Sequence, residues 1–218
     1  MKKRIAIATA LFILLTTITT QQQILITNFK LKDIEIENNF LLKKKNIKKL
    51  LRPIYNKNLI LLNYSEIQKV MMQNSFIESF KVKKKYPNSL KIKIFEKKPI
   101  AILFYKKKKF YLSEKIELIE FKYLKDYKNL PYVFGNKDEF KTLYFNLKEI
   151  NFPLNLIKNY TYFESNRWDL KTKNQKIIKL PSKNYIKSLQ NYLVIQDKDS
   201  FKKFIVFDYR IEDQLILK

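Results

Sequence analysis

The chain has 218 residues and a formal net charge of +25, carried by 45 Lys and Arg against 20 Asp and Glu. It contains no His, no Cys and one glycine, Gly135. These absences exclude a His or Cys zinc site, a cysteine nucleophile, a Ser-His-Asp triad and a glycine-rich phosphate loop. We therefore expect no catalytic residues, no metal ligands and no cofactors, and a protein that is not an enzyme.

Almost all of the positive charge is lysine, because arginine occurs only four times. Lysine is accompanied by abundant Ile and Asn and by little Gly or Ala, a profile typical of an AT-rich coding sequence that fills surface positions with lysine. Arginine binds phosphates and bases better than lysine does, because its guanidinium can donate two parallel hydrogen bonds. We therefore interpret the lysines as a solvated surface and expect no nucleic-acid partner and no small-molecule substrate.

The N-terminus has the pattern of a membrane anchor. Three cations at positions 2–4 precede an uncharged run over residues 5–20, and the apolar character continues past three glutamines to Ile26. A helix over 5–26 is about 33 Å long, enough for a hydrocarbon core of about 30 Å, whereas 5–20 alone reaches only about 24 Å. The cations favour a short cytoplasmic tail over 1–4. We expect one transmembrane helix over 5–26 and the bulk of the chain outside the cytoplasm.

A cleaved secretory signal is the alternative, because it has the same charged start and apolar core. It differs in the small residues before its cleavage site, and this run ends in Thr-Thr-Ile-Thr-Thr-Gln without an Ala-x-Ala. An uncleaved anchor is therefore favoured. A buried soluble helix is a third interpretation, and it fits the charge asymmetry poorly.

Residues 29–98 predict the order strand, helix, helix, strand, strand. Isoleucines alternate with acidic residues over 31–37, which indicates a half-buried strand. Apolar residues at helical spacing predict one helix over 47–54 and a second that begins at the cap Ser65. Two alternating runs joined by the turn residues 87–89 predict a hairpin.

From residue 99 the sequence becomes strand-like and rich in Ile, Phe and Tyr, with helical stretches around Phe140 and Leu189. This predicts a mostly antiparallel β domain with a few helices over 99–218, and an α+β fold class for the chain. The expected strands cover residues 100–105, 110–112, 115–121, 160–163, 168–171, 177–180, 204–209 and 215–217.

Residues 82–101 form a basic hairpin with an aromatic-proline turn that leads into Glu-x-x-Pro-x-Ala. The second domain contains Leu-Pro-x-x-x-Gly at 130–135, a Trp-Asp-Leu hairpin that begins at Trp168, and Asp208-x-Arg210. In these motifs, of which 82–101 is the most specific, and over nearly its whole length, the sequence resembles the FtsQ/DivIB family of cell division proteins. The aromatic residue that follows this arginine in the family is replaced by Ile211 here.

The resemblance implies a POTRA domain (β-α-α-β-β) over 29–98 and an FtsQ-type β domain over 99–218. It implies a bitopic scaffold of the bacterial divisome that links early and late division proteins. The protein would be a single-pass type II protein of the inner membrane, largely periplasmic and located at the division septum. Its partners would be FtsB- and FtsL-like membrane division proteins and other divisome components. In the family, the final strands of the β domain receive an extended segment of FtsB as an added strand.

The site residues follow from this mode of binding, because an edge strand offers unpaired backbone groups to such a segment. Arg167 and Arg210 are candidates for contacts with an acidic partner, with the equal alternative that each pairs with its own neighbour, Asp169 or Asp208. We predict the partner-binding residues to be Arg167, Tyr209, Arg210, Ile211, Leu215, Ile216 and Leu217.

The sequence gives less support to two other functions. Ser200-x-x-Lys203 has the spacing of a serine acyl-transfer motif, but the Ser-Asp-Asn and Lys-Thr-Gly motifs that accompany it elsewhere are missing. Another POTRA-bearing membrane assembly or transport factor is the second alternative. Outer-membrane members carry a barrel of many strands, for which 218 residues leave no room.

Overall fold

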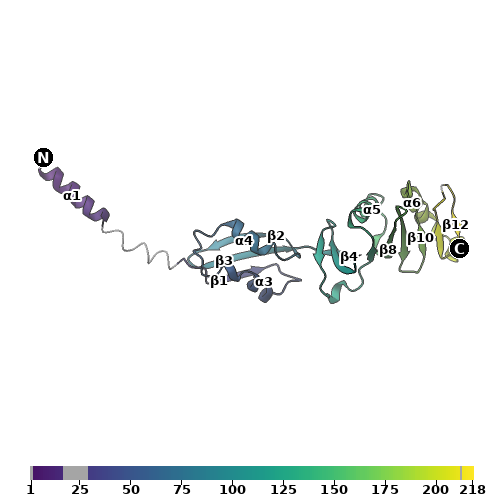
Figure 1. Ribbon diagram of the computed structural model, residues 1–218, viewed down its shortest axis with the longest axis horizontal. Coiled ribbons are helices and arrows are strands. Elements are labelled where there is room, and N and C mark those ends of the chain that lie inside the picture. Colours follow the sequence, from purple (N-terminus) through teal and green to yellow (C-terminus); the bar gives the residue numbers. More distant parts are fainter. Residues whose placement is uncertain (1, 17–28, 212) are drawn as a thin grey trace. The chain divides into compact units, whose positions relative to one another are not determined.

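The computed structural model describes residues 2–16, 29–211 and 213–218. The chain divides into two compact units, Met1–Lys97 and Lys98–Lys218. The first helix, α1, spans Lys2–Thr16 (Figure 1). No helix within the described ranges has both the length and the apolarity needed to cross a membrane. Residues 17–26 of the predicted anchor lie outside these ranges.

The first unit has a three-stranded sheet in the order β1-β3-β2, in which β1 is parallel and β2 antiparallel to β3. Two helices and a short 3-10 turn lie between β1 and β2 in the sequence (Figure 1). The predicted order of strand, helix, helix, strand, strand is therefore correct. The elements are β1 (Asp33–Glu37), α3 (Lys44–Leu50), η2 (Arg52–Ile54), α4 (Tyr64–Met71), β2 (Ile77–Lys85) and β3 (Ser89–Glu96).

Alternation along the strands places every second residue of this sheet in the core. Ile36, Ile92 and Ile94 are at most 2% exposed, as are Ile47 of α3 and Ile67 of α4. The other face of the sheet is charged, as the alternating pattern predicts. Its acidic residues pair with lysines, and the ion pairs are Glu35–Lys85, Glu35–Lys91 and Glu37–Lys91.

The predicted cap of the second helix is wrong. Helix α4 begins at Tyr64, and Asn63 with its extended backbone is the N-cap. The side chain of Glu66 accepts a hydrogen bond from the backbone N–H of Asn63 at 3.4 Å. Asn-x-x-Glu satisfies two free backbone amides at once, which a serine two residues later does not. Ser65 therefore lies inside the first turn.

The second unit contains a nine-stranded sheet in the order β12-β11-β10-β9-β8-β7-β4-β5-β6. Five neighbouring pairs are antiparallel and three are parallel. The strands are β4 (Pro99–Tyr105), β5 (Lys108–Ser113), β6 (Leu118–Glu120), β7 (Tyr132–Phe134), β8 (Ile157–Phe163), β9 (Arg167–Thr172), β10 (Ile177–Lys179), β11 (Val206–Asp208) and β12 (Ile216–Leu217). The helices are α5 (Lys137–Glu149), α6 (Tyr185–Ile195) and α7 (Asp199–Lys202), and the 3-10 turns are η3 (Lys125–Tyr127) and η4 (Leu154–Leu156).

Helical crossovers explain two of the three parallel pairs, and the third, β4 with β7, is joined through β5, β6 and η3. Helix α5 joins β7 to β8, and α6 with α7 joins β10 to β11, so each second strand returns in the direction of the first. Strand β7 was not predicted. It has only three residues, between Pro131 and Gly135, which is too short a run to show a period of two.

Helices α5 and α6 cover one face of this sheet (Figure 1). Tyr160, Leu170, Ile178 and Phe207 follow one another across four strands on the covered face, and each is at most 2% exposed. Trp168 is 4% exposed in the same core.

The single glycine is required by its surroundings. Gly135 has φ +149°, and a Cβ added there would lie 2.6 Å from the Cβ of Tyr162. No side chain fits at that distance, and L-residues rarely adopt this φ.

Candidate interaction site

The outer edge of the second sheet is formed by β12, which pairs antiparallel with β11. The backbones of Val206 and Lys218 exchange hydrogen bonds of 2.9 and 3.1 Å. The next pair along, Phe207 with Leu217, is therefore a non-hydrogen-bonded pair. The N–H and C=O of Leu217 point away from β11, toward an edge that no other described strand covers.

The side chains of this edge divide between the two faces of the sheet. Leu215 and Leu217 are partly buried against the core of the second unit. Ile216 lies on the other face and is 39% exposed. An added strand would meet anchored leucines on one face and an accessible isoleucine on the other, which is how alternating side chains give specificity in strand addition.

Arg210 is held by its own neighbour. Its Nε and Nη2 donate to the carboxylate of Asp208 at 2.8 and 2.6 Å, and its backbone N–H donates to the same carboxylate at 3.1 Å. The arginine side chain stays 44% exposed whereas that of Asp208 is only 5% exposed. The hydrogen bonds from Arg210 hold the pKa of Asp208 below its ordinary value. The outer side of the guanidinium therefore remains accessible.

Arg167 also pairs within its strand, but less completely. Its Nη1 lies 3.5 Å from Oδ1 of Asp169, and both atoms are buried without a hydrogen bond among the described residues. The guanidinium stacks 4.4 Å from the ring centre of Phe163, and Nε donates to Ser165 at 3.0 Å. Burial raises the pKa of Asp169 despite the arginine. The pair thus leaves one buried donor and one buried acceptor without a hydrogen bond among the described residues.

Tyr209 and Ile211 differ sharply in exposure. Tyr209 is 6% exposed, its hydroxyl donates to Oδ1 of Asn191 at 2.9 Å, and burial raises its pKa. Ile211 is 52% exposed. Of the two, only Ile211 offers its side chain to a partner without rearrangement.

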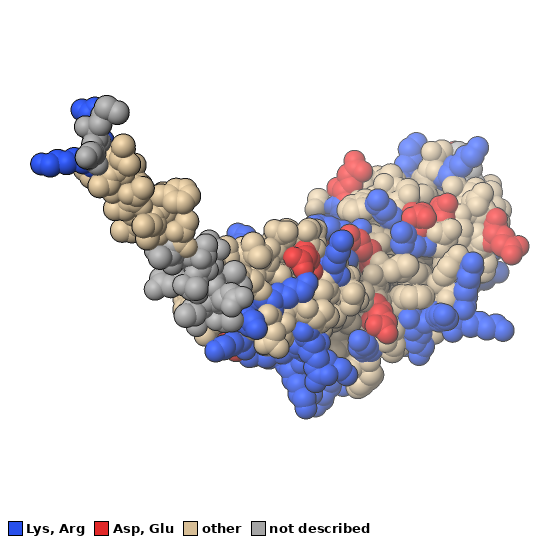
Figure 2. Space-filling view, turned by 60° about the vertical axis from the view of Figure 1, so that its left-hand side comes forward, with Lys and Arg blue, Asp and Glu red and all other residues tan. Residues whose placement is uncertain are grey.

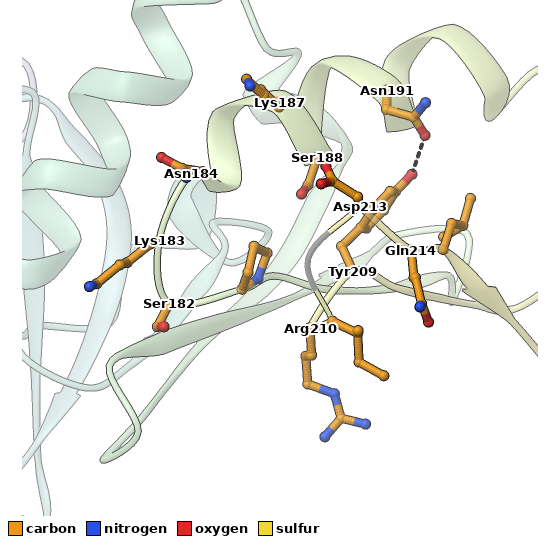
Figure 3. A pocket seen from close by; sticks show the side chains of 13 residues that line it. Ser182, Lys183, Asn184, Lys187, Ser188, Asn191, Tyr209, Arg210, Asp213 and Gln214 are labelled. Carbon is orange, nitrogen blue, oxygen red and sulfur yellow. Dashed lines mark hydrogen bonds between the residues drawn. The ribbon is translucent and has the colours of Figure 1, made fainter.

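A pocket of about 500 Å³ lies beside the edge, between the start of α6 and the segment that joins β11 to β12 (Figure 3). Four of the predicted residues line it: Tyr209, Arg210, Ile211 and Leu215. Figure 3 shows the guanidinium of Arg210 pointing away from α6. The structure thus brings six predicted residues into one region that combines the β12 edge with this pocket, and Arg167 lies two strands from β11, on β9.

The wall of the pocket formed by α6 was not predicted. Lys187, Ser188 and Asn191 line it, and the buried residues of the helix are Leu189, Tyr192 and Ile195. Their spacing is that of one polar helix face, so the signal was present, but a polar face is the ordinary pattern of any surface helix.

Positive charge is widespread on the surface. Lys and Arg side chains spread over the face shown in Figure 2, with Asp and Glu in separate spots. Residues 29–97 hold 17 Lys or Arg against 6 Asp or Glu, a net charge of +11, and residues 98–218 hold 25 against 14, also +11. The first unit therefore carries the same excess on about half as many residues. An acidic partner segment would be attracted to either unit.

Residues 29–97 match the family model of the POTRA domain, FtsQ-type. The chain is similar to the cell division protein FtsQ of Rickettsia conorii, with 28% identity over 193 residues that cover 81% of this chain and 72% of that protein. It is 27% identical to FtsQ of Rickettsia bellii over the same shares of both chains. For FtsQ of Agrobacterium fabrum the identity is 23% over 93% of this chain and 65% of that protein.

Among solved structures, the chain matches the major extracytoplasmic domain of the cell division protein DivIB from Geobacillus stearothermophilus. The match covers 47% of this chain and 92% of that one, with 17% identity and a TM-score of 0.33.

Proposed function

Because the chain belongs to the FtsQ/DivIB family of cell division proteins, we propose that it is a single-pass membrane scaffold of the bacterial divisome that acts by binding other proteins. The second unit binds FtsB- and FtsL-like membrane division proteins and so links early and late division proteins. The uncovered edge of β12 carries this proposal, because it offers the outward backbone groups of Leu217 next to a pocket and an accessible arginine.

The same proposal places residues 1–4 in the cytoplasm, an anchor over 5–26 in the inner membrane, and the POTRA and β domains over 29–98 and 99–218 in the periplasm at the septum. The cations at positions 2–4 and the apolar run behind them support this orientation. If the tagged protein did not gather at midcell, or if its depletion did not produce filamentous cells, the proposal would fail.

The binding site can be tested with one proline. Leu217→Pro removes the N–H that points to the open edge and leaves the bonds between Val206 and Lys218 in place. Proline is tolerated at such edge positions. We expect about a tenfold loss in co-purification of an FtsB-like partner from membranes, from the lost hydrogen bond and the strand it would have joined.

The opposite edge of the sheet provides the matched control. The backbone N–H of Ser113 bonds to the carbonyl of Glu117 at 3.0 Å, so the next pair, Leu112 with Leu118, leaves the N–H of Leu118 pointing outward from β6. Leu118→Pro should leave partner binding unchanged. Equal losses in both variants, or none in either, would remove β12 as the binding edge.

A further inference from the structure

The end of the first unit where the chain enters the sheet carries exposed apolar side chains. Leu61 is 73% exposed, Tyr86 57% and Ile60 51%. We propose that this entry end, made of Lys30, Lys32, Lys57, Ile60, Leu61 and Tyr86, docks on the headgroup layer of the membrane that holds the anchor and binds anionic lipid phosphates. This inference rests on the proposed anchor over 5–26.

Backbone hydrogen bonds gather three segments into the entry end. The N–H of Leu59 bonds to the carbonyl of Phe29 at 2.7 Å, and that of Leu31 bonds to the carbonyl of Lys57 at 2.9 Å. The rings of Phe29 and Tyr86 meet edge to face at 5.9 Å. Residues 29–31, the loop before α4 and the β2-β3 turn therefore lie side by side.

The loop holds its apolar side chains outward in a fixed conformation. Leu59 and Leu62 are 0% and 3% exposed and fix its two ends in the core. Between them, Oδ1 of Asn58 accepts from the N–H of Ile60 at 2.9 Å, and Nζ of Lys84 donates to the carbonyl of Ile60 at 3.0 Å. Ile60 and Leu61 are thus presented to solvent by a loop that has its own supports, and clustered exposed apolar side chains mark interaction surfaces.

Lysines surround these apolar side chains. Lys57 pairs with Glu66, but Lys30 and Lys32 are exposed and have no ion pair among the described residues. Apolar and aromatic side chains ringed by lysine are the combination that binds the interface of an anionic bilayer, where tyrosine rings sit at headgroup level and lysines meet phosphates.

The short stretch of chain between the proposed anchor and the first unit favours the membrane as the surface that the entry end contacts. The proposed anchor ends at Ile26, three residues before Phe29. Three residues of chain reach at most about 10 Å in any conformation. The entry end is therefore held close to the surface of the same membrane, at a high effective concentration of headgroups.

The other end of this unit has a similar composition without that proximity. Phe40 is 82% exposed in a loop whose backbone N–H groups at 40–42 bond to the carboxylate of Glu96, next to the lysines that begin α3. The eight residues of β3 separate the two ends by about 25 Å. A label at position 40 therefore controls for side-chain exposure and nearby positive charge at a site far from the entry end.

The full chain can be labelled at one site, because it contains no cysteine. Leu61→Cys and Phe40→Cys, each carrying an environment-sensitive fluorophore, are reconstituted through the anchor into vesicles of phosphatidylcholine with phosphatidylglycerol. We expect the label at 61 to shift to the blue and to be quenched by a quencher attached to the lipid headgroups, and the label at 40 to behave as in water.

Charge is tested on the same labelled chain. Lys30→Gln with Lys32→Gln should lower the docking equilibrium about 25-fold, and Lys44→Gln with Lys45→Gln, two exposed lysines at the other end, should leave it unchanged. Pure phosphatidylcholine vesicles should weaken docking as the first pair of substitutions does.

The outcomes separate this inference from the proposed function. A chain that does not float with vesicles at all lacks the anchor, and the proposed membrane scaffold falls with it. A chain that floats while its label at 61 stays in water overturns membrane docking and leaves the anchor standing. Crosslinking of position 61 to a protein in intact cells, with no lipid contact, would also overturn it.

Discussion

The two units carry equal net charge but place their polar groups differently. In the first unit, the ion pairs lie on the open face of the sheet and at the surface, and its buried core within the described residues is apolar. In the second unit, Ser113, Thr172 and Asp208 are buried, and Arg167 and Asp169 keep buried atoms without hydrogen bonds. Surface pairs contribute little to stability, whereas buried polar groups cost free energy unless they are satisfied.

The difference indicates which polar groups each unit needs for its stability. The first unit can lose most single charges without unfolding, so its charge excess is free to serve long-range attraction to acidic surfaces. We expect the second unit to depend on particular buried polar contacts, of which the pair of Asp208 with Arg210 lies next to the β12 edge. The four substitutions below test this contrast.

Gly135→Ala should have the largest effect. The new Cβ would lie 2.6 Å from the Cβ of Tyr162 at a backbone φ of +149°, so the second unit should lose about 3 kcal/mol or more of unfolding free energy. Urea unfolding followed by the fluorescence of Trp168, the single tryptophan, measures this. Ser182→Ala, at an exposed position of the same unit, is the control. A loss below about 1 kcal/mol would show that the backbone around Gly135 shifts to accommodate the added methyl group.

Asp208→Asn should lower the stability of the second unit by about 2 to 3 kcal/mol, because the buried carboxylate accepts hydrogen bonds from three N–H groups of Arg210, at Nε, Nη2 and the backbone. The same unfolding experiment measures the loss. An unchanged midpoint would mean that the pair is as dispensable as a surface ion pair.

The pH dependence of this variant has a defined sign. Arg210 lowers the pKa of Asp208 in the folded chain, so the stabilisation is present above the unfolded pKa of about 3.9 and is lost as the pH falls through the lower folded pKa. The acid limb of wild-type stability should therefore be steeper than that of Asp208→Asn. Parallel acid limbs would contradict this assignment.

Glu96→Gln tests a carboxylate of the first unit that, like that of Asp208, accepts several hydrogen bonds. Its carboxylate accepts the N–H groups of Phe40, Leu41 and Leu42 at 3.2, 2.6 and 3.0 Å. An amide has a single acceptor oxygen, so we expect a loss of about 1 to 2 kcal/mol. Faster amide exchange at residues 40–42 would locate the effect, and unchanged exchange there would exclude this role.

Asp33→Asn should have the smallest effect. Its pair with Lys48 spans 3.3 Å, and the two side chains are 66% and 44% exposed. We expect a change of at most about 0.5 kcal/mol in the unfolding free energy of the first unit. A loss as large as that of Asp208→Asn would end the contrast between the units.

The sequence predicted most elements of both units, because apolar periodicity is a local signal. The alternation over 31–37 predicted β1, and the two alternating runs joined by the turn at 87–89 predicted β2 and β3. Strand β7 was missed because three residues between a proline and a glycine show no period, and the cap of α4 was misplaced by two residues although Asn63 and Glu66 match a capping box.

The candidate site was less predictable. The family motif led to Arg210 and to the final strand, but it gave no sign that Tyr209 points into the core or that α6 supplies one wall of a pocket. These depend on packing between segments that lie apart in the sequence, which no local pattern records. The pairing of Arg167 with Asp169 was foreseen as an alternative, and only the structure shows that it leaves both groups partly unsatisfied.

The pairing order of the first sheet constrains how the protein matures. Strand β1 is the first part of this sheet in the chain, yet its only strand partner there is β3, whose register joins Asp33 to Ser89. In the proposed export behind an N-terminal anchor, β1 would emerge first and stay unpaired until residues 89–96 have followed. Pairing across such a separation makes folding slow, so β1 would expose its unpaired backbone groups for the whole of that interval.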